Sequence, residues 1–267
     1  MTGRKILIPA AALLAAAVFT GFASRVHSST AVPQSDAVRY EIASKEEIRH
    51  DLSAYTQGLF FHDGKLYEST GQYGESSFRE VDPATGKVLR KEVLPQEYFG
   101  EGSCVLDGRA YILTWYEQTC LVYDIASFTK LAELPYQGQG WGLTTDGRSL
   151  IMSDGSSVLS FRDPMTFAEQ RTLTVMEGGR EVPYINELEY IGGKIWANVY
   201  GLDEIFIIDP VSGQVVGRVD CRGLLDAEYR TRAVDVLNGI AWNPADSTLY
   251  LTGKYWPRMY KVTIRPR

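Results

Sequence analysis

The sequence predicts an all-β protein, a five-bladed β-propeller of four-stranded antiparallel blades. Two observations support this fold class: a short stretch containing glycine, aromatic and polar residues recurs five times at similar intervals, and a hairpin signal follows each copy. Repeats of roughly 40 to 50 residues have the size of one propeller blade. From residue 38 onward the chain reads as short strands separated by turns, with no long stretch of helical period.

The first recurring motif opens the innermost strand of each unit. Its copies occupy residues 55–59, 100–103, 140–143, 185–188 and 237–240. Their equivalent positions, separated by steps of 44, 40, 45 and 52 residues, are Gln57, Glu101, Trp141, Asn186 and Asn238. Because the innermost strands of a propeller line a central channel, we expect these five side chains to face one another across one pocket.

Two further motifs define the rest of each unit. An Asp-Gly or Gly-Gly pair stands at residues 63–64, 107–108, 146–147 and 192–193, and such a pair is the strongest short hairpin signal. The fifth copy, over residues 242–250, has a longer loop, which accounts for the larger last step. An Asp-initiated turn, usually Asp-Pro, then predicts a connection to an outer fourth strand in the first four units.

The fifth unit lacks a fourth strand of its own. The chain ends soon after residues 259–264, which read as the third strand of that unit, and no Asp-Pro turn follows. Residues 38–50 belong to no unit. They are therefore predicted to supply the missing strand, so that strands from both termini close the fold.

The first 30 residues have the pattern of an export signal. Arg4 and Lys5 precede an apolar run over residues 6–22, and small residues follow, which favours cleavage between Ala23 and Ser29. An uncleaved anchor is the alternative, because the run is only just long enough to span a membrane. Residues 31–37 are a predicted linker and residues 38–267 the propeller domain. We expect an exported monomer, periplasmic or secreted, with no other membrane contact.

Composition excludes several classes of function. The net charge of -6 and the lack of a basic stripe argue against a nucleic-acid partner. Cys104, Cys120 and Cys221 are expected to be free thiols, since the first two fall on strands about 10 Å apart. His50 and His62 form no ligand cluster, which argues against catalytic zinc. The chain also lacks a phosphate-binding loop and a nucleophile elbow.

Glu101 is the strongest candidate for a catalytic residue. It stands between two glycines and directly after Tyr98-Phe99-Gly100, and an acid buried among apolar groups needs a functional reason. The second strand of each hairpin returns to the end of the channel where the first strand begins, which brings Lys254 and Trp115 toward Glu101. A lysine there is costly unless it meets an anion or a reacting carbonyl group. Taken singly, the other converging polar residues are explained equally well as ordinary turn residues.

The ordered motifs of the chain resemble one known family. They lie at residues 55–59, 66–74, 98–102, 113–115, 140–143, 153–156, 186–190, 196–199, 237–241 and 252–257. Over essentially the whole mature chain they are similar to the plant and bacterial type of glutaminyl cyclase, also called glutamine cyclotransferase. The resemblance implies a five-bladed propeller enzyme without metal or other cofactor. Such an enzyme converts N-terminal glutaminyl residues of peptides and proteins into pyroglutamyl residues and releases ammonia.

The resemblance supports Glu101 as the catalytic acid, and the chemistry of such a ring closure suggests roles for the other residues. Glu101 would shuttle the proton, and Gln57 and Lys254 would stabilise charge on the carbonyl oxygen. Asn186 would hold the substrate amine or backbone carbonyl. The residues expected to fold the substrate side chain into its attacking shape are Phe99, Trp115, Trp141, Trp196 and Trp256. For Trp196, packing between blades is an equal interpretation.

Two alternatives remain open at this level. A calcium-dependent propeller lactonase or related hydrolase would use Glu101, Asn186 and Asn238 as oxygen ligands of a hard cation. A non-catalytic binding propeller of the cell envelope would use the same pocket without turnover. Loss of activity with a chelator, restored by calcium, would favour the lactonase.

Overall fold

The computed structural model describes residues 37–267, and within them the fold is all-β. Apart from strands, this part of the chain contains a single 3₁₀ turn, η1 (Ala227–Tyr229). The export signal or anchor predicted for residues 1–30 lies outside the described residues, as does the predicted linker except for Ala37. No helix of residues 37–267 has the length and apolar character needed to cross a membrane.

Three separate sheets each contain four antiparallel strands in sequence order. The first consists of β2 (Thr56–His62), β3 (Lys65–Thr70), β4 (Ser77–Val81) and β5 (Val88–Val93). The second consists of β6 (Gly100–Leu106), β7 (Arg109–Thr114), β8 (Thr119–Asp124) and β9 (Lys130–Pro135). The third consists of β10 (Leu143–Thr145), β11 (Leu150–Ser153), β12 (Val158–Arg162) and β13 (Glu169–Thr174).

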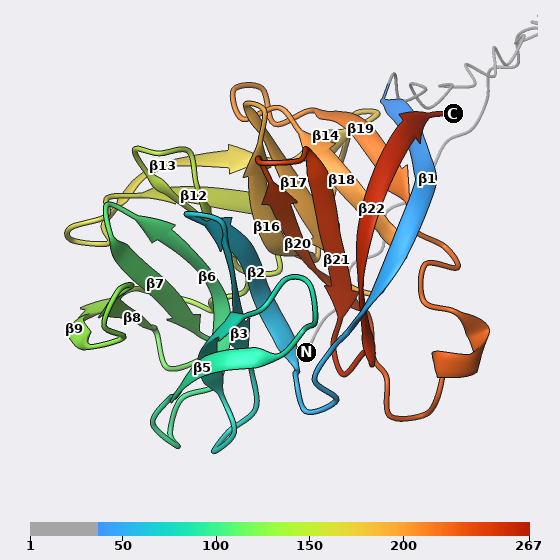
Figure 1. The fold of residues 1–267 in the computed structure, drawn as a ribbon. Coiled ribbons are helices and arrows are strands. Elements are labelled where there is room, and N and C mark those ends of the chain that lie inside the picture. Colours follow the sequence, from blue (N-terminus) through green and yellow to red (C-terminus); the bar gives the residue numbers. More distant parts are fainter. Residues whose placement is uncertain (1–36) are drawn as a thin grey trace, which may run out of the picture. The chain divides into compact units, whose positions relative to one another are not determined.

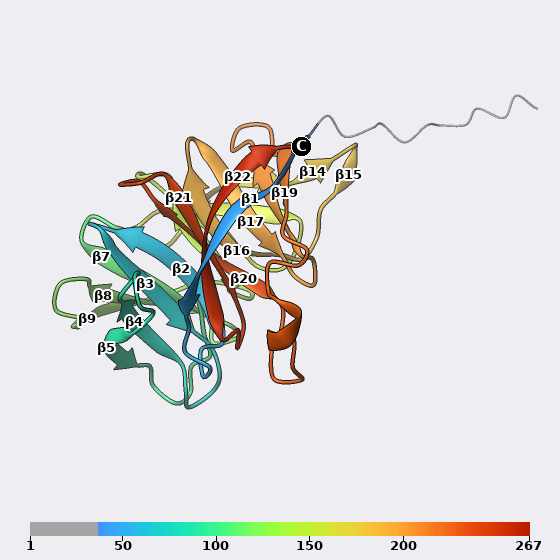
Figure 2. The ribbon, with the colours of Figure 1, turned by 45° about the vertical axis from the view of Figure 1, so that its right-hand side comes forward.

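A fourth sheet of eight strands combines two further four-stranded units. One unit is β16 (Ile185–Ile191), β17 (Lys194–Val199), β18 (Glu204–Ile208) and β19 (Val215–Asp220). The other is β20 (Leu237–Asn243), β21 (Thr248–Gly253), β22 (Arg258–Pro266) and β1 (Val38–Arg49). Parallel pairing of β19 with β1 joins the two units, and Figure 2 shows β1 between β22 and β19.

The N-terminal strand completes the last unit. β1 pairs antiparallel with β22 from Tyr40 opposite Pro266 to Arg49 opposite Arg258, with one irregularity near Ile42. The two terminal strands therefore lie side by side although they are the most distant in sequence. This is the arrangement that the missing fourth strand of the fifth unit predicts.

The first strands of the five units contact one another in a closed cycle. β2 contacts β6, β6 contacts β10, β10 contacts β16, β16 contacts β20, and β20 contacts β2. Figure 1 labels β2, β6, β16 and β20 of this cycle. The apolar core follows the same cycle, because each of the five clusters of buried side chains lies between two consecutive units. The cluster between the last unit and the first, for example, joins Leu59 and Leu66 to Tyr250 and Met259. Each fully buried side chain of this size contributes about 1.5–3 kcal/mol.

The turns follow from the local sequence. Asp63 and Gly64 have φ of 48° and 75°, and Asp107 and Gly108 have 51° and 72°, the pair of positive angles that a type I′ hairpin requires. In the Asp-Pro turns the aspartate accepts backbone hydrogen bonds, as Asp209 does from two residues that follow it. The hairpin and Asp-Pro signals are thus confirmed as turns between strands.

Two elements lie outside the predicted repeats. A small hairpin of β14 (Met176–Glu177) and β15 (Arg180–Glu181) precedes β16, and η1 lies in the long connection between β19 and β20. The three cysteines are buried free thiols, as expected.

Candidate active site

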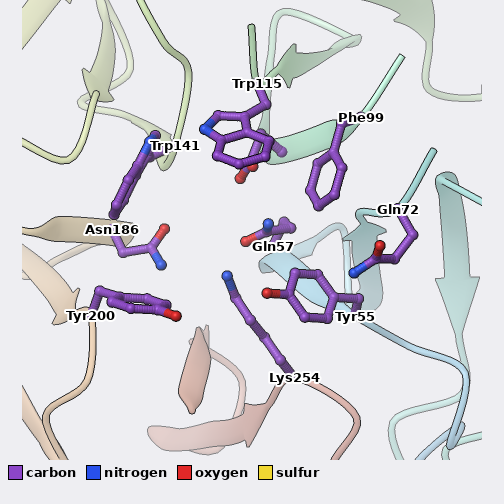
Figure 3. A pocket seen from close by; sticks show the side chains of 10 residues that line it. Tyr55, Gln57, Gln72, Phe99, Trp115, Trp141, Asn186, Tyr200 and Lys254 are labelled. Atoms are coloured by element: carbon purple, nitrogen blue, oxygen red, sulfur yellow. The ribbon is translucent and has the colours of Figure 1, made fainter. Parts of the chain in front are cut away.

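A cavity of about 450 Å³ lies where the first strands begin and the second strands end. Its walls come from all five units (Figure 3). The lining residues are Tyr55, Gln57, Gln72, Phe99, Glu101, Trp115, Trp141, Asn186, Tyr200 and Lys254. Seven of the nine predicted site residues are therefore brought together, and three aromatic or amide residues join them.

Backbone irregularities turn the polar side chains inward. The pairing of the first two strands shifts register between Thr56 and Gly58, between Gly100 and Ser103, and between Ile185 and Leu188. Each shift inserts extra residues at the start of the inner strand, which re-aims a side chain that regular alternation would place elsewhere. The inserted residues include Gln57, Glu101 and Asn186. Trp141 occupies the corresponding place just before β10.

The two glycines beside Glu101 allow neighbouring strands to approach closely. A Cβ atom on Gly100 would lie 2.8 Å from the carbonyl oxygen of Thr70, and one on Gly102 would lie 2.5 Å from the backbone nitrogen of Leu143. Neither backbone could accept a side chain without moving. The Gly-Glu-Gly sequence therefore fixes the carboxyl group at the junction of three units.

Glu101 is buried in a poorly compensated environment. Its exposed fraction is only 4%. Burial raises the pKa of this carboxyl group well above its usual range, although the Lys254 ammonium group opposes the shift, and Glu117 adds to it. No hydrogen bond from residues 37–267 contributes to holding its charge. A carboxyl group with a raised pKa is suited to accept a proton and to return it during a reaction.

Lys254 faces Glu101's cavity from the turn after β21. Its ammonium nitrogen lies 4.6 Å from the centre of the Tyr55 ring and 5.6 Å from that of Tyr200. Burial lowers the pKa of Lys254, while the charges of Glu101 and Asp235 raise it in part. In Figure 3 the side chain extends toward Gln57 between the two tyrosine rings. The cation is therefore held by aromatic faces with its nitrogen directed into the cavity.

Two tryptophans are fixed by one amide. The indole nitrogens of Trp115 and Trp141 donate hydrogen bonds of 2.9 and 3.1 Å to the same Gln139 side-chain oxygen. The Trp115 ring also packs against Phe99 at 5.3 Å, and that of Trp141 against Tyr200 at 6.0 Å. These contacts hold one aromatic wall of the cavity in a single arrangement.

The amide residues differ in their surroundings. Asn186 lines the cavity, and its backbone oxygen accepts a 2.7 Å hydrogen bond from Ser153. Gln57 also lines it, with its side-chain oxygen 3.5 Å from the amide nitrogen of Asn238. Asn238 itself donates to the backbone oxygen of Thr56 at 2.9 Å and is fully buried behind Gln57. It supports the site without lining it.

Trp196 and Trp256 do not line the cavity. Trp196 stands opposite Glu189, near the hairpin end of β17, whereas the cavity is reached only at Tyr200. Tyr200 lies four residues further along the chain than Trp196, which in extended backbone corresponds to about 13 Å. Trp256 is part of the core cluster between the last two units, and its indole nitrogen donates to the backbone oxygen of Asp235.

The sequence reasoning did not single out Tyr55, Gln72 or Tyr200. Tyr55 belongs to the first copy of the recurring motif, so its position relative to Gln57 was an available signal. Gln72 follows β3 with a φ of 106°, a strained conformation for a residue other than glycine. Tyr200 directly follows β17, at the end of that strand which lies at the cavity.

No group of three or more His, Cys, Asp or Glu side chains within residues 37–267 is arranged to hold a metal ion. Besides two tyrosine hydroxyls, the polar groups that line the cavity are one carboxylic acid, one ammonium group and three carboxamides. This set can transfer a proton and donate hydrogen bonds to a carbonyl oxygen.

Comparison with known proteins agrees with this chemistry. A family model described as glutamine cyclotransferase matches residues 13–264. The chain belongs to the glutamine cyclotransferase family. A curated glutaminyl-peptide cyclotransferase from Arabidopsis thaliana is 42% identical over 231 residues, which cover 84% of this chain and 72% of the relative. The crystal structure of Myxococcus xanthus glutaminyl cyclase superposes with a TM-score of 0.80 at 33% identity, over 86% of this chain and 99% of that one.

Proposed function

We propose that this chain is a glutaminyl-peptide cyclotransferase, which converts N-terminal glutaminyl residues of peptides and proteins to pyroglutamyl residues and releases ammonia. Membership of the glutamine cyclotransferase family and the identity to the Arabidopsis enzyme support the activity. The observation that carries the mechanism is the buried Glu101 carboxyl group, which shares an aromatic cavity with Lys254.

Glu101 is proposed to shuttle the proton. The substrate α-amino nitrogen attacks its own side-chain carbonyl carbon, and Glu101 accepts the proton that this nitrogen loses. The carboxylic acid then gives a proton to the side-chain amide nitrogen, which leaves as ammonia. One carbon–nitrogen bond forms, one breaks, and no water is consumed. The raised pKa of Glu101 suits both transfers, because it makes the carboxylate a stronger base for the first transfer and leaves a carboxylic acid for the second.

The remaining polar residues are proposed to stabilise the transition state. Attack at the carbonyl carbon places negative charge on its oxygen, where the Lys254 ammonium group and the Gln57 amide can act as donors. Asn186 is proposed to hold the substrate amine or the first backbone carbonyl. The walls formed by Phe99 and Trp115 restrict the flexible side chain, since an intramolecular closure depends mainly on orientation.

We further propose that the fold is a five-bladed propeller. The closed cycle of first strands and the five clusters between consecutive units support it. Residues 1–30 are proposed to be an export signal followed by a short linker, on the pattern of their sequence. Mass determination of the exported protein tests the cleavage, and gel filtration tests the expected monomer.

The test of the function is ammonia release from a short peptide beginning with glutamine, with the product checked by mass. We expect turnover that persists after exhaustive EDTA treatment. Calcium-dependent hydrolysis of a lactone, without ammonia release from the peptide, would instead identify the lactonase alternative. Peptide binding without any turnover would identify a binding protein.

A further inference from the structure

A second cavity, of about 570 Å³, lies beside the candidate active site. We call it the flanking groove, and its apolar lining includes Leu52, Tyr229, Val234, Tyr255 and Pro257. Most of it comes from the long connection between β19 and β20, at the lower right of Figure 1. This connection belongs to none of the repeats.

A pair of contacting aromatic rings lies between the groove and the active-site cavity. Tyr55 lines the cavity and Tyr255 lines the groove, and their ring centres are 5.0 Å apart. Tyr255 has a φ of 57°, a costly conformation for a bulky residue, and its backbone nitrogen donates to Ala54 at 2.8 Å. The chain thus holds this tyrosine in a strained position between the two cavities.

The groove and the Lys254 turn are parts of one hydrogen-bonded unit. The backbone nitrogen of Asp235 donates to Lys254, and that of Lys254 donates to Val236. The side-chain oxygen of Tyr55 donates to the Asp235 carboxylate at 3.4 Å. A ligand in the groove would therefore lie against the same segment that carries the active-site cation.

The groove leaves apolar surface uncovered in the described structure. Leu52 is 67% exposed, and Ala233 is also exposed. Glu228 lines the same groove, and Asp235 lies at its boundary with the cavity, so the fixed acids disfavour a negatively charged ligand. Among the described residues no cation lines the groove: Arg258 is paired with Glu47 and stacks on Tyr229, and Arg232, exposed between Thr231 and Ala233, is not one of the wall residues.

We propose that the flanking groove binds the residues that follow the N-terminal glutamine of the substrate, and that it prefers apolar over acidic side chains there. The inference rests on the proposed function, because only a peptide substrate continues beyond the active-site cavity. An extended chain advances about 3.3–3.6 Å per residue, so the second and third residues can cross a partition of two rings and reach the groove.

The test compares three peptides, Gln-Leu-Leu, Gln-Gly-Gly and Gln-Glu-Glu, by ammonia release. We expect kcat/KM to be about 10-fold higher for the leucine peptide than for the glycine peptide, mainly through KM, and lowest for the acidic peptide. In the double variant Leu52→Ser, Val234→Ser the leucine-to-glycine ratio should fall toward one. The matched control Leu131→Ala, an exposed leucine on the outer strand β9, should keep the wild-type ratio.

Several outcomes would overturn the proposal. Equal use of the leucine and glycine peptides by the wild type would refute it, as would a preference that survives the double variant or disappears in the control. A dimer in gel filtration that the double variant abolishes would assign the groove to a second copy of the chain. Failure of every version to release ammonia from any of the peptides would remove the proposed function itself, which the other outcomes leave intact.

Discussion

Replacing Glu101 by glutamine should stabilise the protein while it removes activity. The carboxyl group is buried, and its raised pKa means that the folded state binds a proton more tightly than the unfolded state. The free energy of unfolding therefore falls as the pH rises from about 4.5, the pKa of the group in the unfolded chain, toward its raised pKa in the folded protein. Glutamine has nearly the same shape and does not ionise. Removing a buried ionisable group that has too few partners should increase the free energy of unfolding by about 1–3 kcal/mol. In a domain of this size each kcal/mol raises Tm by roughly 2–4 °C.

The sign of the pH dependence makes this prediction specific. Near pH 4 both proteins carry a neutral group at position 101, so their Tm values should agree. Above that pH the wild type alone should lose stability, and the difference in Tm should grow. Differential scanning calorimetry between pH 4 and 8 measures it.

The same substitution should reduce kcat for ammonia release by about 10²- to 10⁴-fold with little change in KM, because a general acid–base group acts in the transition state. Glu117→Gln is the matched control. Glu117 raises the pKa of Glu101, so its loss should move the acidic limb of the kcat/KM profile to lower pH without a large loss of rate. An active Glu101→Gln enzyme, or one that is less stable than the wild type at pH 7, would refute the reasoning.

Three further predictions concern Gln139, Lys254 and the buried pair of His50 and Glu68. Gln139→Leu removes the acceptor shared by both indoles, and steady-state kinetics should show a KM increase of about 10-fold; an unchanged KM would contradict this. Lys254→Met should lower kcat by about 10²- to 10³-fold and move the acidic limb of the rate profile to higher pH, because the cation that lowers the pKa of Glu101 is lost. Burial alone would lower the pKa of His50, but the carboxylate and hydrogen bond of Glu68 raise it. The stability that protonated His50 contributes is therefore complete below about pH 6.5 and is lost as the pH rises through the raised pKa. In the Glu68→Gln variant, burial should lower the pKa of His50. Thermal melts should then show stability that increases with pH, the reverse of the wild-type dependence.

Much of the fold could be predicted because its turns depend on local chemistry. Asp-Gly pairs such as Asp63-Gly64 specify hairpins by their backbone angles, and neither residue depends on distant contacts. The glycines Gly100 and Gly102 could also be recognised from the sequence, although the backbones that approach them, at Thr70 and Leu143, belong to neighbouring units. The hairpins fix where each inner strand ends, and the glycines beside Glu101 mark where β6 begins.

The direction of a side chain at a strand end could not be predicted in this way. Lys254 and Trp256 are two residues apart, yet the positive φ of Tyr255 turns the chain between them, and Trp256 packs into the core. Gly253 permits this, because a Cβ atom there would meet the Trp256 indole at 2.3 Å. Only the tertiary packing decides which of the two enters the cavity.

The flanking groove was also beyond sequence reasoning. The connection between β19 and β20 has no counterpart in the other units, so no repeat reveals where it folds. Its placement depends on backbone hydrogen bonds between Asp235, Val236 and Lys254, which carry no side-chain signature.

The most direct test of the proposed mechanism is a crystal structure of the protein with a pyroglutamyl peptide, the product. The mechanism predicts the ring nitrogen within about 3.2 Å of the Glu101 carboxyl group and the ring carbonyl directed at Gln57 or Lys254. A product bound outside this cavity, or one whose ring nitrogen points away from Glu101, would contradict it.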